Sequence, residues 1–274
     1  MAITMADIQH LRKMTGAGMM DCKNALNEAN GDIEKAIEVI RKKGQAFAAK
    51  REDRDASEGC VLAATKDGYA ALVAIKCETD FVAINADFVG MAKNILDSAL
   101  ASKPADAEAL KNVEIEGHII ADVITNRSGI TGEKMELGSF ESIEAPSVVA
   151  YVHPGNKLAT IVGFSKPNVD EQIARDIAMQ VAAMNPVSIL PEEVSEEIKE
   201  RERSIAKEKA IAAGKPENLL DRIAEGAVTK FIKEFTLLQQ EFIKDSKITV
   251  AQYLAKYDKD LEVTAFKRFT LNAE

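Results

Sequence analysis

The chain has 274 residues, 46% of them hydrophobic, which is enough to bury more than one core. Its net charge of −9 argues against general nucleic-acid binding, because phosphates need a basic surface. The sequence has neither an apolar run of membrane-spanning length nor a signal-peptide pattern, so we expect a cytoplasmic protein with no membrane partner. Cys22, Cys60 and Cys77 are odd in number and lack metal-ligand spacing, which indicates reduced thiols, mostly in the core.

The first fifty residues predict three short helices. The break at Thr15-Gly-Ala-Gly18 separates the first helix from a second, which extends from about Met19 to Ala29. Asp32 caps a third helix, which we expect to end at Gly44. Three helices of this size form a bundle that is marginal alone and typical of a docking module. The charged segment from Lys50 to Glu58 is predicted to be a solvated helix end or linker.

Apolar residues of this bundle are candidates for its core and for its surface. Leu11 shares the apolar face of the first helix with Ile8 and Met14. Met19 and Met20 are neighbours about 100° apart on a helix, so both cannot occupy one narrow stripe. One is therefore expected in the core, and the other is either a neutral surface residue or an adaptable apolar contact.

The stretch from Ala71 to Val82 is predicted to begin as a buried strand and end in a turn. A helix follows from about Asn85 to Ser98, because Asn85 is a good cap and apolar residues recur at helical spacing. Thr79 to Val82 therefore lies at a strand-to-helix junction, where scaffolds usually display functional residues. Periodicity alone favours burial of Phe81, since most large aromatic side chains are buried.

The pattern of strands, turns and helices occurs twice, as two hairpin-plus-helix units. Antiparallel strands with helices on one face give an α+β fold class. The second unit resumes after a connecting region with its own helical and strand signals. The first unit comprises Cys60 to Ala64, the turn Lys66-Asp67-Gly68 and Ala70 to Cys77; the second comprises Val148 to Val152, the turn His153-Pro-Gly-Asn156, Leu158 to Phe164 and a helix from about Asp170 to Met184.

The remaining segments complete the predicted architecture. Ala107 to Asn126 is helical by pattern and contains His118, which we expect to be a structural histidine, and Ser128 to Glu144 has short strand character. Two helices separated by Gly214-Lys-Pro216 predict an antiparallel helical hairpin, and the first helix is so highly charged that we expect it to project into solvent. Val263 to Phe269 alternates apolar and polar residues and is assigned to the core sheet.

Motifs of catalysis and nucleotide binding are absent from the sequence. Without a phosphate loop, a dinucleotide fingerprint or a metal-ligand spacing, we expect no bound nucleotide, metal or cofactor. Glu78 and Asp80 allow an acidic-site enzyme as an alternative, although the sequence shows no basic partner for them. A docking adaptor of the ubiquitin type, built on the first helices, is a further alternative. His153 is expected to be exposed at a hairpin tip, with or without a contact role.

Two long motifs resemble the elongation factor Ts family. The first is Thr15-Gly-Ala-Gly-Met-Met-Asp-Cys-Lys23, followed by Ala25-Leu26 and Glu28-Ala-Asn-Gly-Asp32. The second is Cys77-Glu-Thr-Asp-Phe-Val82, at the distance expected for the family. Both occur in the right order, and the resemblance extends over nearly the whole chain.

This resemblance implies a translation factor that promotes exchange of GDP for GTP on elongation factor Tu and has no catalytic chemistry of its own. The implied partner is that GTPase in its GDP-bound and nucleotide-free forms, while a homodimer of this chain stays open. The implied domains are a ubiquitin-associated-like three-helix module at 1–53, an N-terminal core subdomain at 54–144, a first part of the C-terminal core subdomain at 145–186, a protruding helical hairpin at 187–230 and the rest of that subdomain at 231–274.

The resemblance also implies roles for individual residues. Asp80 and Phe81, with Thr79 and Val82 beside them, would press against a helix of the GTPase near the Mg²⁺ and phosphate site, so Phe81 would be exposed in the free protein. Ile84 stands where the family usually has a basic residue, which we expect to tune affinity. The other implied partner contacts are Leu11, Met19 and Met20 on the nucleotide domain, His153 on a distal domain, and Gly132 loosely matched beside the Thr79 to Val82 turn.

Overall fold

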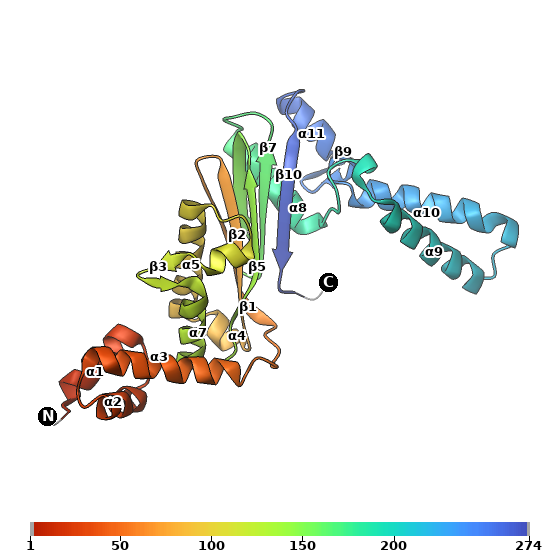
Figure 1. Ribbon diagram of the computed structural model, residues 1–274. Helices are drawn as coiled ribbons and strands as arrows, with labels where there is room; N and C mark the ends of the chain where they lie inside the picture. The colour runs from red at the N-terminus through yellow and green to blue at the C-terminus, as the bar shows by residue number, and fades with distance from the viewer. Residues whose placement is uncertain (1–2, 273–274) are drawn as a thin grey trace.

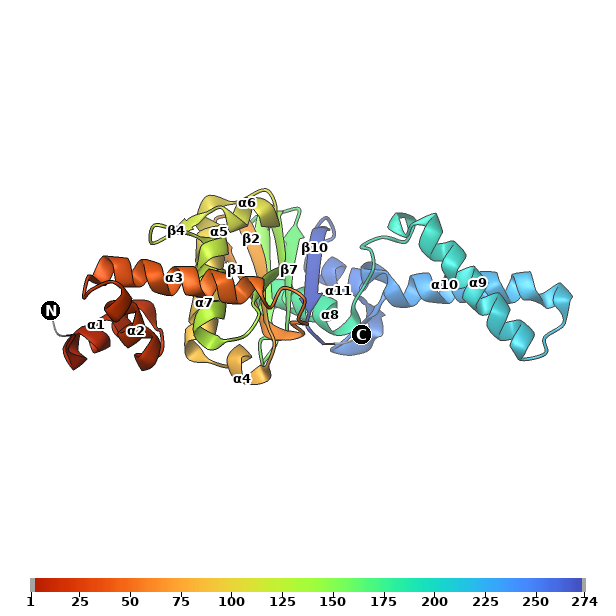
Figure 2. The same ribbon diagram turned by 60° about the horizontal axis from the view of Figure 1, so that its bottom comes forward.

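A computed structural model describes residues 3–272 of the chain. Two antiparallel sheets of three strands pack face to face, and helices cover the outer face of each (Figure 1). A helical module extends from one end of this sandwich and a helical hairpin from the other (Figures 1 and 2). The structure is therefore mixed helix and antiparallel sheet, as the α+β prediction requires.

The N-terminal module is a bundle of three helices with its own core. Leu11, Cys22 and Leu26 are fully buried there. The third helix does not end at Gly44, as the sequence suggested, but continues across helix α7 of the core (Figure 2). Gly44 instead lies at the crossing, where a Cβ on Gly129 would fall 2.3 Å from its Cα. The helices are α1 (Met5–Thr15), α2 (Met19–Glu28) and α3 (Ile33–Ala49).

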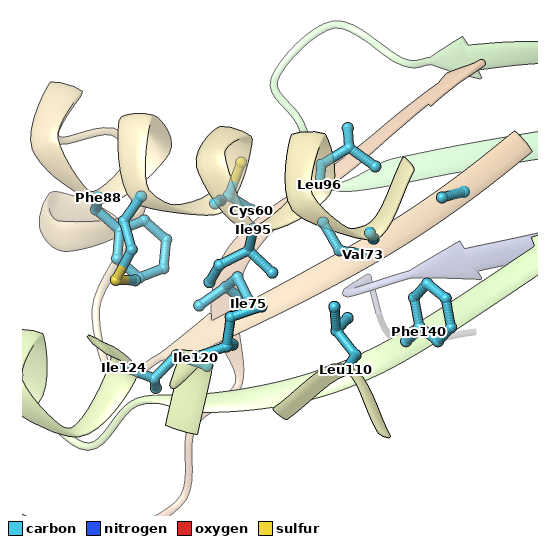
Figure 3. Packing of buried hydrophobic residues seen from close by; sticks show 14 of the residues in the cluster. Cys60, Val73, Ile75, Phe88, Ile95, Leu96, Leu110, Ile120, Ile124 and Phe140 are labelled. Atoms are coloured by element: carbon cyan, nitrogen blue, oxygen red, sulfur yellow. The ribbon is translucent and has the colours of Figure 1, made fainter. Parts of the chain in front are cut away.

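The first sheet has the strand order β1-β2-β5, and its central strand is buried on both faces. Ala71, Val73 and Ile75 point to the helical layer, where Phe88 and Ile95 of α5 cover them (Figure 3). The alternate residues of β2 face the second sheet, which explains its continuous apolar sequence. The elements are β1 (Glu58–Lys66), β2 (Tyr69–Cys77), α4 (Asp80–Ala83), α5 (Ala86–Ser102), α6 (Ala107–Lys111), β3 (Glu114–Ile115), β4 (His118–Ile119), α7 (Ile120–Thr131) and β5 (Glu136–Glu144).

One predicted helix is wrong in this half of the core. The stretch from Ala107 to Asn126 is not continuous, because the β3–β4 hairpin interrupts it between α6 and α7. Glu116 and Gly117 both have positive φ, 53° and 81°, which is the geometry of a tight hairpin turn. His118 is consequently exposed on the hairpin and is not a structural histidine within a helix.

The second sheet has the strand order β10-β7-β6 and repeats the arrangement of the first. Ala159 and Ile161 of its central strand face the first sheet, whereas Val162 and Phe164 pack beneath α8 and α11. The assignment of Val263 to Phe269 to the core sheet is confirmed by the pairing of β10 with β7. The elements are β6 (Ser147–Val152), β7 (Leu158–Phe164), α8 (Glu171–Met184), β8 (Glu241–Phe242), β9 (Asp245–Thr249), α11 (Val250–Tyr257) and β10 (Val263–Thr270).

The helical hairpin consists of α9 (Glu196–Ala212) and α10 (Leu220–Phe235) and projects from the second half of the core (Figure 1). Ion pairs such as Arg203–Glu225 and Lys207–Asp221 join the two helices across their exposed faces. At its base, Val187 N donates to Phe235 O at 2.8 Å, so the two ends of the hairpin return to one point of the core.

Candidate partner-binding site at the end of the first sheet

The chain leaves strand β2 through a single helical turn, which we call the α4 turn and define as residues 79–84. Thr79 caps this turn by accepting a hydrogen bond from Val82 N at 3.4 Å. Asn85 then caps α5, with Oδ1 accepting from the backbone amides of Asp87 and Phe88. Two caps in succession hold the α4 turn between a buried strand and a buried helix, which restricts its conformation.

Two large apolar side chains of the α4 turn face solvent. Phe81 is 80% exposed and Ile84 is 78% exposed, while Ala83 packs into the core between them. The burial of Phe81 expected from periodicity is therefore wrong, and its exposure agrees with what the family resemblance implies. Asp80 is also exposed, so the turn presents an acid and an aromatic residue next to each other.

Glu133, from the connection after α7, makes three hydrogen bonds to the start of the α4 turn. One carboxylate oxygen accepts from the backbone amides of Glu78 and Thr79, at 3.2 and 3.0 Å. The other accepts from the Thr79 hydroxyl at 2.6 Å. Nothing in the local pattern around Glu133 indicates a partner 54 residues away, so this role cannot be predicted from the sequence. Gly132 directly precedes it and ends α7 with φ 77°, so the structure brings this predicted residue beside the α4 turn.

Glu78 makes the reciprocal contacts. Its carboxylate accepts from Lys134 N at 2.6 Å, from Arg51 at 3.1 Å and from Arg54 at 2.8 Å. Burial opposes ionisation of Glu78, but the Lys134 amide and the two guanidinium groups together lower its pKa to about 2. Glu78 is thus a fixed carboxylate that holds two segments together, and it is poorly suited to give or take a proton at neutral pH.

The cysteine that precedes this cluster is also fixed. Cys77 is buried and directs its thiol to Thr79 O at 3.3 Å. Burial and the negative charge of Glu133 raise the pKa of Cys77 to about 12. The thiol is consequently protonated and unreactive at neutral pH, in agreement with its predicted place in the core.

The tip of the β6–β7 hairpin lies at the same end of the sandwich as the α4 turn. Lys157 pairs with Glu58 at 2.7 Å, and Glu58 is the residue that pairs with Cys77 in the sheet. The hydrogen bond to Glu58 raises the pKa of Lys157, partial burial opposes the shift, and the charge of Asp80 adds to it. His153 is exposed at this tip, where Nδ1 lies 2.9 Å from the Tyr151 hydroxyl.

The three predicted residues of the N-terminal module have different environments. Leu11 is fully buried in the bundle, so its side chain does not form part of the surface. Met19 is half-buried against the same core, and Met20 is 65% exposed. Of the two methionines, Met20 is therefore the surface residue and Met19 the core residue. A partner that touches this module would meet Met20, while Leu11 supports it from inside.

Other kinds of site are less developed in the described part of the chain. Residues 3–272 contain no group of three or more His, Cys, Asp or Glu side chains that could hold a metal ion. Across the same residues, no helix combines the length and apolar character needed to cross a membrane. An open cleft of about 660 Å³ lies between the N-terminal module and the core, lined by α3, α5, α7 and the β3–β4 hairpin.

Comparisons with known proteins show the family of this chain. The family model described as elongation factor TS matches residues 78–273, a range that begins at Glu78. The chain is 62% identical to Elongation factor Ts of Porphyromonas gingivalis and 58% identical to that of Azobacteroides pseudotrichonymphae, in each case over the full length of both chains. It is 47% identical to Elongation factor Ts of Bacteroides thetaiotaomicron, again with both chains fully covered. The chain therefore belongs to the elongation factor Ts family of translation elongation factors.

Proposed function

We propose that this chain binds elongation factor Tu in the cytoplasm and promotes exchange of GDP for GTP by disturbing the Mg²⁺ and phosphate site of that GTPase. The observation that carries the proposal is the exposure of Phe81 on a turn that lies between two N-caps, Thr79 of α4 and Asn85 of α5. Burying such a side chain against a partner stabilises a complex by about 1.5–3 kcal/mol. In the free protein, the same side chain has no packing role.

Exchange requires no active site in the factor, only linkage. GDP and Mg²⁺ stabilise one conformation of the GTPase, and the factor stabilises another, so each weakens the binding of the other by the same coupling free energy. A rigid turn is suited to this task, because a flexible one would yield before the partner did. Asp80 and Phe81 are the residues that would enter the partner, with Thr79 and Val82 holding them in place.

Anchoring elsewhere on the partner would come from surfaces other than the α4 turn itself. Met20 would anchor the N-terminal module, since of Leu11, Met19 and Met20 it is the exposed side chain, while Met19 is half-buried and Leu11 lies in the core of the bundle. His153 would contact a second domain of the GTPase, and Gly132 would lie at the border of the α4 turn. We also propose that the three-helix bundle is a module of the ubiquitin-associated type.

The enzyme alternative receives no support from the geometry. Glu78 is engaged by Arg51, Arg54 and Lys134 N, and its lowered pKa keeps it ionised. Asp80 is exposed. The two carboxylates are therefore not arranged as an acid and a base.

Release of a fluorescent GDP analogue from purified elongation factor Tu, with and without this chain, tests the proposal. We expect release to accelerate with increasing concentration of the chain and to saturate. Isothermal titration of GDP into the chain alone is the companion measurement, and it should give no heat of binding. Unchanged release, or micromolar GDP binding by the chain itself, about −8 kcal/mol, would contradict the assignment.

A further inference from the structure

The start of the α4 turn is held by a side chain outside both family motifs. Glu133 accepts three hydrogen bonds, from Glu78 N, Thr79 N and the Thr79 hydroxyl. A carboxylate is an acceptor at both oxygens, so it can receive all three at once. Hydrogen bonds to an ionised acceptor are also stronger than those between neutral groups. The Glu133 carboxylate therefore fixes the backbone at the point where the chain turns out of β2.

The hydroxyl of Thr79 connects this carboxylate to the cap of the α4 turn. A hydroxyl has one hydrogen to donate and lone pairs to accept with. Because Thr79 donates its hydrogen to Glu133 at 2.6 Å, its lone pairs are free to face Val82 N, which donates to it at 3.4 Å. Glu133 thus orients the group that caps the turn, although it touches neither Asp80 nor Phe81 in this network.

A second carboxylate completes the arrangement from the opposite side. Glu78 accepts a hydrogen bond from Lys134 N, while Glu133 accepts one from Thr79 N. Each of the segments 78–79 and 133–134 therefore donates a backbone amide to a carboxylate of the other. The ammonium of Lys134 donates to the carbonyl oxygens of Glu52 and Arg54, both at 2.9 Å. Arg51 and Arg54 bind Glu78. The linker after the N-terminal module is thereby joined to the same cluster.

We propose that Glu133 is a positioning residue that sets the direction in which Asp80 and Phe81 project and fixes that direction relative to the N-terminal module. The inference rests on the proposed function of the α4 turn and deepens it. Its physical basis is pre-organisation, because a contact residue can displace part of a partner only when the residues that hold it stay in place. Misplacement of a functional group by about 1 Å can reduce a rate by up to about a hundredfold.

Amide hydrogen exchange on the free chain tests the geometric part without any partner. In Glu133→Ala, protection of the Thr79 amide should fall about tenfold or more, and that of Val82 should fall with it. Glu133→Gln keeps one acceptor oxygen, so it should lie between the wild type and Glu133→Ala. Glu144→Ala is the matched control, because its carboxylate pairs with Lys103 at 3.0 Å and Glu144 lies opposite Tyr69, at the other end of β2 from the α4 turn. Unchanged protection at Thr79 in Glu133→Ala overturns the proposal.

Nucleotide release tests the functional part. At saturating factor, Glu133→Ala should reduce the maximal rate of GDP release by about tenfold, while the half-saturating concentration stays within about twofold, since the surface anchors are intact. Adding Glu133→Ala to a variant that already carries Asp80→Ala and Phe81→Ala should cost less than about twofold more, because these are the two side chains that Glu133 directs. Glu144→Ala should match the wild type. A maximal rate of wild-type size in Glu133→Ala overturns the proposal and leaves the proposed function standing.

Two further outcomes are decisive. If Glu133→Ala is unfolded at the assay temperature, Glu133→Gln replaces it, since its amide keeps the length of the side chain and one acceptor oxygen but loses the second acceptor. A maximal rate in Glu133→Gln below that of the wild type supports the proposal, and a wild-type rate overturns it. A wild-type chain that leaves GDP release unchanged overturns the proposed function and with it the role of Glu133 in exchange.

Discussion

The two halves of the core share one architecture but differ at the end of their central strands. In each half, a three-stranded antiparallel sheet carries a long helix on its outer face. Strand β7 ends in Phe164, which is fully buried, and the chain enters α8 past a Lys166–Asp258 ion pair at 2.6 Å. Strand β2 instead leads into the α4 turn with its exposed Phe81. The fold therefore does not require an exposed aromatic residue at the end of the central strand. A role in function explains the exposure of Phe81 better than a role in folding does.

The largest expected effect separates these two phenylalanines. Phe164→Ala should destabilise the chain by about 3–5 kcal/mol, because it leaves a cavity in a packed core. Phe81→Ala should change the free energy of unfolding by no more than about 0.5 kcal/mol, since its side chain is already exposed in the folded chain. Urea unfolding of both variants measures the difference.

The same preparations also separate the two residues in activity. Phe81→Ala should slow GDP release from elongation factor Tu, whereas the folded fraction of Phe164→Ala should retain its rate. If Phe81→Ala unfolds several kcal/mol early and its folded fraction exchanges normally, Phe81 belongs to the core in solution and the contact with the partner lies elsewhere.

A second prediction concerns the attachment of the N-terminal module to the first half. Gly129→Ala would place a Cβ 2.3 Å from Gly44 Cα, so it should force α3 and α7 apart and destabilise by about 1–3 kcal/mol. Gly44→Ala is the matched control, because its Cβ would lie 3.6 Å from Gly129 Cα, an ordinary contact. It should be neutral or stabilise by up to about 1 kcal/mol through helix propensity. Thermal unfolding of both variants tests the asymmetry, and equal behaviour would contradict the crossing.

Local signals were sufficient where a segment's own pattern determines its structure. The caps at Asp32 and Asn85, the hairpin turn at Lys66-Asp67-Gly68 and the apolar face of α5 were all predicted from sequence and are found. These features depend on hydrogen bonds or periodicity within a few residues. The two hairpin-plus-helix units, and with them the position of the α4 turn, follow from such signals.

Predictions failed where a distant part of the chain decides the structure. Gly44 resembles a helix end but lies inside α3, where this helix packs closely against Gly129 of α7. The Glu116-Gly117 turn contains a glycine, which is a common turn residue. The apolar residues at helical spacing on both sides of it nevertheless favoured one continuous helix. Glu133 carries no local signal of its role, since its partners lie over fifty residues earlier. Supporting residues of a site are the hardest to find from one sequence for this reason.

Acid should weaken the two strand ends over different pH ranges. Glu78 has its pKa lowered from 4.5 to about 2, so its contribution to stability is complete above about pH 4.5 and is lost as the pH falls towards 2. The loss should be about 1 kcal/mol, because Arg54 is largely solvated and screened. The hydrogen bond from Lys166 lowers the pKa of Asp258 below 3.8, so its loss begins at lower pH.

Urea unfolding between pH 5 and 2.5 measures both losses. The difference in stability between the wild type and Glu78→Gln should shrink from about pH 4.5 downward, and that between the wild type and Asp258→Asn only from about pH 3.8. A Glu78→Gln difference that is independent of pH would show that the charge of Glu78 is not what binds Arg51, Arg54 and the Lys134 amide.

The smallest expected effect lies within the α4 turn itself. Ile84 and Phe81 are three residues apart and almost equally exposed, at 78% and 80%, but Ile84 follows the last residue of the helix and Phe81 lies inside it. Ile84→Lys should change the free energy of unfolding by less than about 0.5 kcal/mol, since an exposed position tolerates either side chain. It should also leave the maximal rate of GDP release unchanged and shift only the half-saturating concentration. A new charge at the rim of the contact alters the affinity for the GTPase, but it does not change which element of the GTPase is displaced. Ile84→Ala is the control that removes the apolar side chain without adding charge. If Ile84→Ala lowers the maximal rate as much as Phe81→Ala does, the two side chains act as one contact surface. Ile84 then takes part in displacing an element of the GTPase and does not merely tune the affinity.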